Sequence, residues 1–140
     1  MKSIAYLGPE GTFSDILARQ RFGGAAYLDC GSMEGVFDRV LSGEAKLGLV
    51  PVENSSGGTV YDTVDLLIRH AGAIAIREEL ALDIRIALLG RRGAPVKTVY
   101  SHFIQLKHHA DWLKVRYPGA RLVTVSSTAI AAQRAPKIPS

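Results

Sequence analysis

Two hydrophobic periods alternate along the chain and predict strands and helices in turn. Apolar runs predict five short strands, at 3–7, 25–28, 47–52, 98–101 and 121–125. Apolar residues spaced three and four apart predict five helices, over 13–22, 33–41, 60–70, 102–117 and 129–134. The stretch from Ala73 to Leu89 has no helical period, so we expect one long strand there. This order predicts an α/β protein of two lobes.

The long strand would divide the elements into two groups, because a strand of this length usually crosses between lobes or bends at a bulge. We assign residues 1–76 to a first α/β lobe and residues 77–140 to a second. Helix starts are marked by caps, with Thr12 before the first helix and Ser32 before the second. Asp15 stands three residues after Thr12, as in a short capping box.

Four junctions between a predicted strand and a predicted helix carry small hydroxyl residues. They are GPEGTFS (8–14), ENSSGGT (53–59), YSH (100–102) and SST (126–128). Ligands of open α/β sheets bind outside the carboxyl ends of strands, where free N–H groups and the helix dipole favour anions. Two facing lobes with such ends would form a cleft for a small molecule with two negative groups. Each Ser or Thr can equally be only a helix cap.

Composition narrows the function classes. The chain is 47% hydrophobic with a net charge of +4, which fits a folded protein and suits a small anionic ligand or simple solubility. No basic stripe interleaves with aromatic residues, so we expect no nucleic acid partner. No apolar run approaches the roughly 20 residues of a membrane helix, and the N-terminus does not resemble a signal peptide. Cys30 is alone, is expected to be buried, and is compatible with the reducing cytoplasm.

Four segments together resemble the prephenate dehydratase family. They are AYLGPEGTFS (5–14), VPVENSSGGTVYDTVDLL (50–67), VYSH (99–102) and VSSTAIAA (125–132). The resemblance implies two lobes like those of type II periplasmic binding proteins, with the active site in the cleft. It implies a hydro-lyase of L-phenylalanine biosynthesis that converts prephenate to phenylpyruvate by decarboxylation and loss of the ring hydroxyl as water. Aromatisation drives this reaction, so we expect no metal or organic cofactor.

The resemblance also implies roles for single residues. The catalytic candidates are Glu53, Asn54, Ser101 and His108. The candidates for substrate binding are Thr12, Ser14, Ser55, Thr59, Ser126, Ser127 and Thr128. Asn54 would donate to the substrate, and Glu53 would act as acid or base unless it only pairs with a nearby Arg or Lys. His108 stands where the family has a Gln, and it is either a substitute for that Gln or a surface residue.

The sequence departs from the family at several positions. Phe103 and Ile104 stand where Pro-Gln is usual, and Asp83 and Ile86 replace a Pro and a His of the crossover strand. The Thr-Arg-Phe motif, whose Thr is usually credited as the acid, does not occur in the sequence. We therefore expect a truncated chain with an incomplete second lobe, a broken-off loop over 135–140 and little or no dehydratase activity.

Two other functions stay open. One is a module of the same fold that binds or senses an aromatic acid without chemistry, and the other is a degenerate product that barely folds. The family resemblance also makes a homodimer an expected assembly, with no membrane partner.

Overall fold

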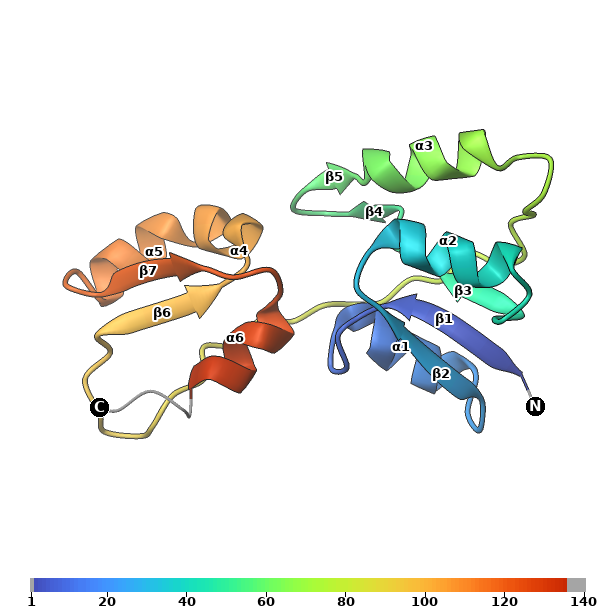
Figure 1. Ribbon diagram of the computed structural model, residues 1–140. Coiled ribbons are helices and arrows are strands. Elements are labelled where there is room, and N and C mark those ends of the chain that lie inside the picture. Colours follow the sequence, from blue (N-terminus) through green and yellow to red (C-terminus); the bar gives the residue numbers. More distant parts are fainter. Residues whose placement is uncertain (1, 136–140) are drawn as a thin grey trace. The chain divides into compact units, whose positions relative to one another are not determined.

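A parallel sheet of three strands lies at the centre of the first unit, Met1–Asp83, of the computed structural model, which describes residues 2–135 (Figure 1). The strands are β1 (Ser3–Leu7), β2 (Ala26–Cys30) and β3 (Leu47–Leu49). Their order is β2-β1-β3, with Tyr6 opposite Asp29 on one side and Leu49 on the other. Central β1 is buried on both faces, as a parallel sheet between helices requires.

Three helices accompany this sheet: α1 (Phe13–Arg21), α2 (Met33–Leu41) and α3 (Tyr61–Arg69). Right-handed connections from β1 to β2 and from β2 to β3 place α1 and α2 on opposite faces (Figure 1). Alternate residues of β1 agree with this placement. Ala5 packs with Val36 of α2, whereas Tyr6 lies near Asp15 of α1. The predicted α/β class is therefore confirmed as a mixed α/β fold.

The predicted caps of the first two helices are confirmed. Thr12 Oγ1 accepts a hydrogen bond from the backbone N–H of Asp15 (3.3 Å), and Ser32 Oγ accepts one from Gly35 (3.1 Å). Each satisfies an N–H group that the first helical turn leaves without a partner. Asp15 differs from a capping box because its carboxylate binds the N–H of Gly11 and not that of Thr12.

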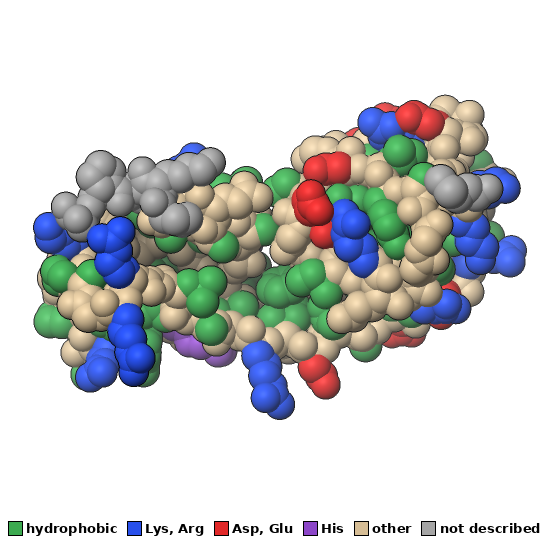
Figure 2. All heavy atoms as spheres, turned by 90° about the horizontal axis from the view of Figure 1, so that it is seen from below, with side chains coloured by type: hydrophobic (Ala, Val, Ile, Leu, Met, Phe, Trp, Pro, Cys, Tyr) green, Lys and Arg blue, Asp and Glu red, His purple; other side chains and the backbone are tan. Residues whose placement is uncertain are grey.

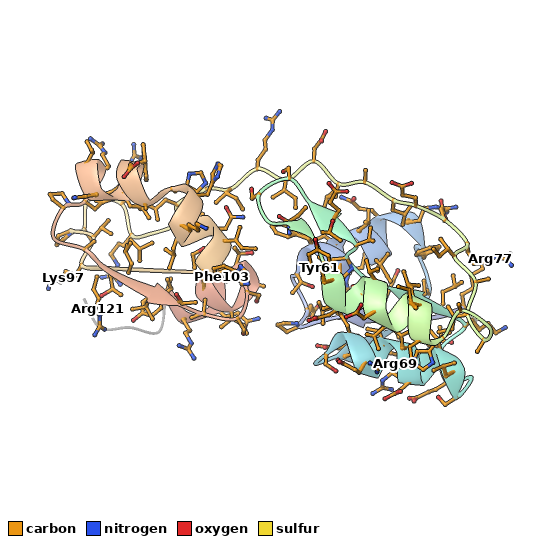
Figure 3. The ribbon with its side chains drawn as sticks, turned by 90° about the horizontal axis from the view of Figure 1, so that it is seen from above. Tyr61, Arg69, Arg77, Lys97, Phe103 and Arg121 are labelled. Atoms are coloured by element: carbon orange, nitrogen blue, oxygen red, sulfur yellow. The ribbon has the colours of Figure 1, made fainter. Side chains whose placement is uncertain are left out.

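Helix α3 is fixed to the first unit through a buried hydroxyl that the apolar pattern did not indicate. Thr63 is fully buried and donates from Oγ1 to the carbonyl of Pro51 (2.7 Å). The buried face of α3 centres on Thr63 and Leu66, while Val64 and Leu67 are half-buried. In Figure 3, Tyr61 and Arg69 mark the two ends of this helix.

Substitution of Thr63 by valine is expected to lower the free energy of unfolding by about 1–2 kcal/mol, because the shape is kept while the carbonyl of Pro51 loses its donor. Urea unfolding followed by circular dichroism measures the change. Thr63→Ser is the control, since it keeps the hydroxyl and removes only a methyl group. A valine variant as stable as the wild type would show that this hydrogen bond does not hold α3.

The second unit, Ile84–Ser140, contains a parallel pair of strands with three helices. The elements are β6 (Thr98–Ser101), α4 (Phe103–His108), α5 (Ala110–Arg116), β7 (Arg121–Thr124) and α6 (Thr128–Arg134). The prediction of one helix over 102–117 is wrong. The chain turns at His109, whose ψ is 15°, and Leu106 and Leu113 on either side of this turn both pack with Val99 of β6.

The long strand predicted over Ala73 to Leu89 is not formed. Residues 74–90 are neither helix nor strand, and within residues 2–135 no backbone–backbone hydrogen bond joins 75–90 to another part of the chain. A strand requires a partner ladder, which the apolar pattern alone does not supply. The assignment of lobes to 1–76 and 77–140 stays a prediction. Of the loop predicted over 135–140, residues 136–140 lie outside the described part.

The described surface carries scattered charge. On the face shown in Figure 2, Lys and Arg side chains occur in both units, between hydrophobic and other polar groups. Over residues 2–135, none of the helices combines the length and the apolar character that crossing a membrane requires.

Candidate functional site

The carboxyl edge of the first sheet gathers the predicted residues of the first unit. Strands β1 and β3 are parallel neighbours, so the segments that leave them start at the same edge (Figure 1). Strand β1 leads into residues 8–12 and the start of α1. Strand β3 leads through Pro51 to a small hairpin of β4 (Glu53–Asn54) and β5 (Gly58–Thr59). This edge is therefore the candidate site of the first unit.

The loop after β1 uses its polar groups largely within itself. The Gly11 N–H donates to Asp15 Oδ2 (2.9 Å), and the Thr12 hydroxyl donates to the Leu7 carbonyl (3.0 Å). Because Thr12 Oγ1 also caps α1, it has little capacity left for an anion. Half-buried Ser14 differs, since its hydroxyl makes no hydrogen bond within the described residues. Thr12 thus shapes the loop, and Ser14 is the available hydroxyl.

The predicted Ser/Gly loop at a helix N-terminus is wrong, because this segment forms a β-hairpin. The N–H groups of Ser56 and Gly57 donate to Asn54 Oδ1 (3.1 and 2.5 Å), and Gly58 has a φ of 74°. An Asn that accepts bonds from the following N–H groups and a Gly with positive φ together favour a tight turn. Thr59 lies in β5 opposite Glu53, so it does not cap α3, which starts after Val60.

The hairpin leaves other groups available at its surface. The Oδ1 of Asn54 is occupied by the turn, whereas its Nδ2 group makes no hydrogen bond within residues 2–135. Glu53 and Ser55, the residues before and after it, are both exposed. Among the described residues Glu53 forms no ion pair, so the alternative of a paired Glu53 is not realised there. An amide donor and a carboxylate are thus neighbours in sequence on β4, where successive side chains point to opposite faces of a strand.

The carboxyl edge of the second unit brings Ser101 close to the segment after β7. Ser101 ends β6, and its carbonyl accepts from the N–H of Val125 (2.9 Å). Ser126 follows directly, and Ser127 caps α6 by accepting from Ile130 N–H (3.1 Å). Ser101, Ser126 and Thr128 keep hydroxyls that make no hydrogen bond within residues 2–135. Ser101 therefore lies next to the 126–128 segment, and the predicted role of these hydroxyls in substrate binding stays a prediction.

Helix α4 separates His108 from that edge. His108 is exposed in the last turn of α4, about 7–8 Å along the helix axis from its first residue, Phe103, at 1.5 Å per residue. Its ring lies edge-on to that of His109, with centroids 4.9 Å apart. The residue at the edge is His102, which caps α4 by accepting from Ile104 N–H (3.4 Å). Its place just before the apolar helical period could have indicated this role.

Comparison with known proteins identifies the chain. The family model for prephenate dehydratase matches residues 4–138. The chain belongs to the prephenate dehydratase family. The resemblance expected from the four sequence segments is thereby confirmed.

Two curated relatives agree with this family. A bifunctional chorismate mutase/prephenate dehydratase of Stutzerimonas stutzeri is 40% identical over 137 residues, which cover 94% of this chain and 36% of the relative. A prephenate dehydratase of Amycolatopsis methanolica is 38% identical, with 94% of this chain and 44% of the relative covered. The chain thus spans less than half the length of these relatives.

Two solved structures also match. Prephenate dehydratase from Arthrobacter aurescens in complex with L-Phe has a TM-score of 0.69 at 30% identity, covering 95% of this chain and 45% of that one. A structure described as GqqA, a novel type of quorum quenching acylase, has a TM-score of 0.73 at 27% identity, covering 97% of this chain and 49% of that one.

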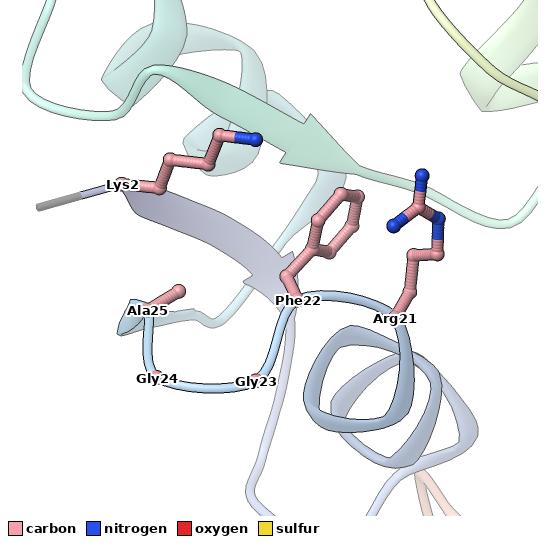
Figure 4. A pocket seen from close by; sticks show the side chains of 6 residues that line it. All are labelled: Lys2, Arg21, Phe22, Gly23, Gly24 and Ala25. Carbon is pink, nitrogen blue, oxygen red and sulfur yellow. The ribbon is translucent and has the colours of Figure 1, made fainter.

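A cavity of about 380 Å³ lies away from the edge that carries the prephenate dehydratase motifs. Lys2, Arg21 and residues 22–25 line it, at the amino end of β1 (Figure 4). The C-terminal carbonyls of α1 point toward this end and oppose an anion there. Arg21 is also paired with Glu78 (2.8 Å). This cavity is therefore not the candidate site for a dianion.

Burial and nearby carboxylates change the pKa of one tyrosine in the central strand of the first sheet. Tyr6 is 2% exposed. Burial, with a further contribution from the Asp15 and Asp29 carboxylates, raises the pKa of Tyr6 from 10.0 to about 12. The neutral phenol is thus favoured in the folded protein.

This shift predicts a loss of stability at alkaline pH. Above pH 10 the unfolded chain releases the Tyr6 proton while the folded chain keeps it, so the free energy of unfolding falls by about 1.4 kcal/mol per pH unit up to about pH 12. Urea unfolding at several alkaline pH values, for the wild type and Tyr6→Phe, isolates this contribution. Equal pH slopes for the two proteins would contradict the shift.

Proposed function

We propose that this chain supplies binding and catalytic residues for the decarboxylative dehydration of prephenate to phenylpyruvate in L-phenylalanine biosynthesis. The observation that carries the proposal is the coincidence of family and geometry. The family match covers residues 4–138, and its motif segments fall at the carboxyl edge of the parallel strands in each unit. Such edges are where α/β sheets bind ligands.

The finer architecture is part of the same proposal. The two units would act as two lobes of a type II periplasmic-binding-protein-like fold, with prephenate held in a cleft between them. Support comes from each unit separately, because each has a parallel sheet whose carboxyl edge presents amide or hydroxyl groups. Two such edges suit a substrate with two carboxylates.

The chemistry sets the demands on these residues. The bond to the ring carboxylate breaks and releases CO₂, its electron pair enters the ring, and the ring carbon–oxygen bond breaks. A proton delivered to the leaving hydroxyl makes water. The protein must therefore hold two carboxylates and place a proton donor near the ring hydroxyl, which is typically worth about 10²–10⁴-fold in rate.

The available groups divide naturally between these tasks. The Nδ2 donors of Asn54 would bind substrate oxygen, with Ser55 beside them and Glu53 as acid or base. Ser14 and Ser101 would bind anionic groups, and Thr12 would act by shaping its loop. The remaining binding candidates of the proposal are Thr59, Ser126, Ser127 and Thr128. His108 is proposed only as a secondary proton donor, since α4 places it away from Ser101.

A binding module without chemistry is the alternative. The Arthrobacter aurescens relative was solved in complex with L-Phe, so a member of this family holds an aromatic amino acid. On this alternative the same fold would bind an aromatic acid and turn nothing over.

Thermal unfolding with prephenate or L-phenylalanine, paired with an assay for phenylpyruvate, separates these functions. We expect prephenate to raise the Tm and L-phenylalanine to have a smaller effect. A shift with L-phenylalanine alone would favour the binding module, and no shift with prephenate would refute the proposal. The expectation of little or no turnover is checked in the same assay, against a full-length relative.

A further inference from the structure

Asn54 is the only asparagine in the sequence, and the turn between β4 and β5 holds its side chain by the oxygen alone. The N–H groups of Ser56 and Gly57 both donate to Asn54 Oδ1 (3.1 and 2.5 Å), whereas Nδ2 makes no hydrogen bond within residues 2–135. Two N–H dipoles on the oxygen draw electron density away from Cγ. The side-chain carbonyl is therefore polarised, and its nitrogen is held by no described group.

The same two hydrogen bonds fold the side chain toward the backbone nitrogen of Ser55. Each closes a ring that runs from Oδ1 through Cγ and the Ser55 peptide to an N–H group further along the chain. The Ser55 N–H donates no hydrogen bond within the described residues. Residues 55–59 are exposed, at the tip of the hairpin that Figure 1 shows, so water reaches this nitrogen. A nitrogen without a partner among these residues thus follows a polarised carbonyl carbon.

We propose that Asn54 is a site of spontaneous deamidation and that the folded turn accelerates it as an oxyanion hole. The Ser55 nitrogen attacks Asn54 Cγ and forms a new N–C bond, and the two N–H donors stabilise the charge that develops on Oδ1. The proton of the Ser55 nitrogen passes through water to Nδ2, the Cγ–Nδ2 bond breaks, and ammonia leaves. Water then opens the five-membered imide at either carbonyl and returns a proton to the nitrogen, which leaves aspartate or isoaspartate at position 54.

The other side-chain amides of the chain do not share this arrangement. Gln20, Gln105 and Gln133 lie in α1, α4 and α6, where the N–H group of the next residue is bonded to the carbonyl four residues earlier. Their longer side chains would also have to close a six-membered ring. A mass gain from loss of ammonia and uptake of water in the folded chain therefore reports on Asn54.

The product would change the hairpin at the candidate site. Aspartate adds a negative charge and removes the Nδ2 donors, and isoaspartate also lengthens the backbone of the turn by a carbon atom. If Asn54 donates to a dianionic substrate, deamidation removes prephenate binding as the protein ages. This consequence rests on the proposed function, whereas the deamidation itself does not.

Incubation of the full chain at mildly alkaline pH, followed by mass spectrometry, measures the reaction. Trypsin releases Asn54 in the peptide 47–69. The same chain in concentrated guanidinium chloride is the reference, because it keeps the sequence and loses the turn. An enzymatic oxyanion-hole donor contributes about 10²–10³-fold, and the exposure of this turn reduces that effect, so we expect the folded chain to deamidate about tenfold faster. A folded rate equal to or below the unfolded rate would overturn the proposal.

Three variants assign the rate to the turn. Gly58→Ala keeps the amide, the nucleophile and both donors, but it strains the turn, since Gly58 has a φ of 74°. It should slow the folded chain severalfold and leave the unfolded rate unchanged. Gly72→Ala is the matched control in open space outside the hairpin and should react as the wild type does. Asn54→Gln should show no mass gain over the same time. A folded Gly58→Ala chain as fast as the wild type would show that the turn does not activate Asn54.

Separation of the aged chain by ion exchange connects the reaction to binding. Calorimetric titration with prephenate compares the intact and the deamidated fractions, and we expect the deamidated fraction to bind more weakly. Equal binding by both fractions would contradict the proposed role of Asn54 toward prephenate, while the measured rates would still decide the deamidation.

Discussion

Replacement of Asp15 by alanine is expected to lower the free energy of unfolding by about 3 kcal/mol. Its side chain is 5% exposed, and the carboxylate accepts two hydrogen bonds, from the Gly11 N–H (2.9 Å) and from Arg19 Nε (2.8 Å). Removal leaves the first without an acceptor and the guanidinium without its buried partner. Breaking a buried pair from one side costs about 3–5 kcal/mol, and the 45% exposure of Arg19 favours the lower end.

Glu10→Gln is the matched control for this prediction. Glu10 contacts the same Arg19 at 3.3 Å, but its side chain is 77% exposed. Exposed pairs contribute about 0–1 kcal/mol, so the control should unfold almost as the wild type does. Urea unfolding of the three proteins measures both changes. A similar loss from Asp15→Ala and Glu10→Gln would show that burial of Asp15 is not what matters.

The Asp15 site also shows what the sequence could predict. Thr12 and Ser32 were correctly predicted as caps because a cap is specified by residues three positions apart. Strands β1 and β6 end at the predicted residues for the same local reason, since turn and cap residues follow them directly. The hydrogen bond from the Gly11 N–H to Asp15 could not be predicted from the sequence. It depends on the conformation of the loop, in which Gly11 has a φ of 85°.

Non-local pairing explains the errors. Segment 73–89 has strand periodicity, but a strand is completed by partners that its own sequence does not name. The Ser/Gly sequence after Asn54 fits both an anion-binding loop and a tight turn. The turn forms because the side-chain Oδ1 of Asn54 accepts hydrogen bonds from the N–H groups of Ser56 and Gly57. His108 lies in the last turn of α4, and its role as a substitute for the family's Gln stays a prediction.

Asn54→Asp is expected to weaken prephenate binding about hundredfold while leaving the fold nearly unchanged. This prediction rests on the proposed function. The aspartate keeps an oxygen for the N–H groups of Ser56 and Gly57, so the hairpin turn is retained. It removes the Nδ2 donors and adds a negative charge beside a dianion. A lost bond to a charged partner costs about 1.5–3 kcal/mol, and about 2.7 kcal/mol corresponds to hundredfold.

Two further variants separate the turn from the substrate contact. Asn54→Ala removes both functions of the side chain, so it should weaken binding and also cost about 1 kcal/mol of stability through the lost turn acceptor. Gln20→Glu makes the same amide-to-acid change at an exposed position of α1, and its binding should match the wild type. Calorimetric titration with prephenate gives the three affinities. If Asn54→Asp bound as tightly as Gln20→Glu, the amide would serve only the hairpin, and substrate recognition in the first unit would pass to Ser14 and the remaining hydroxyls.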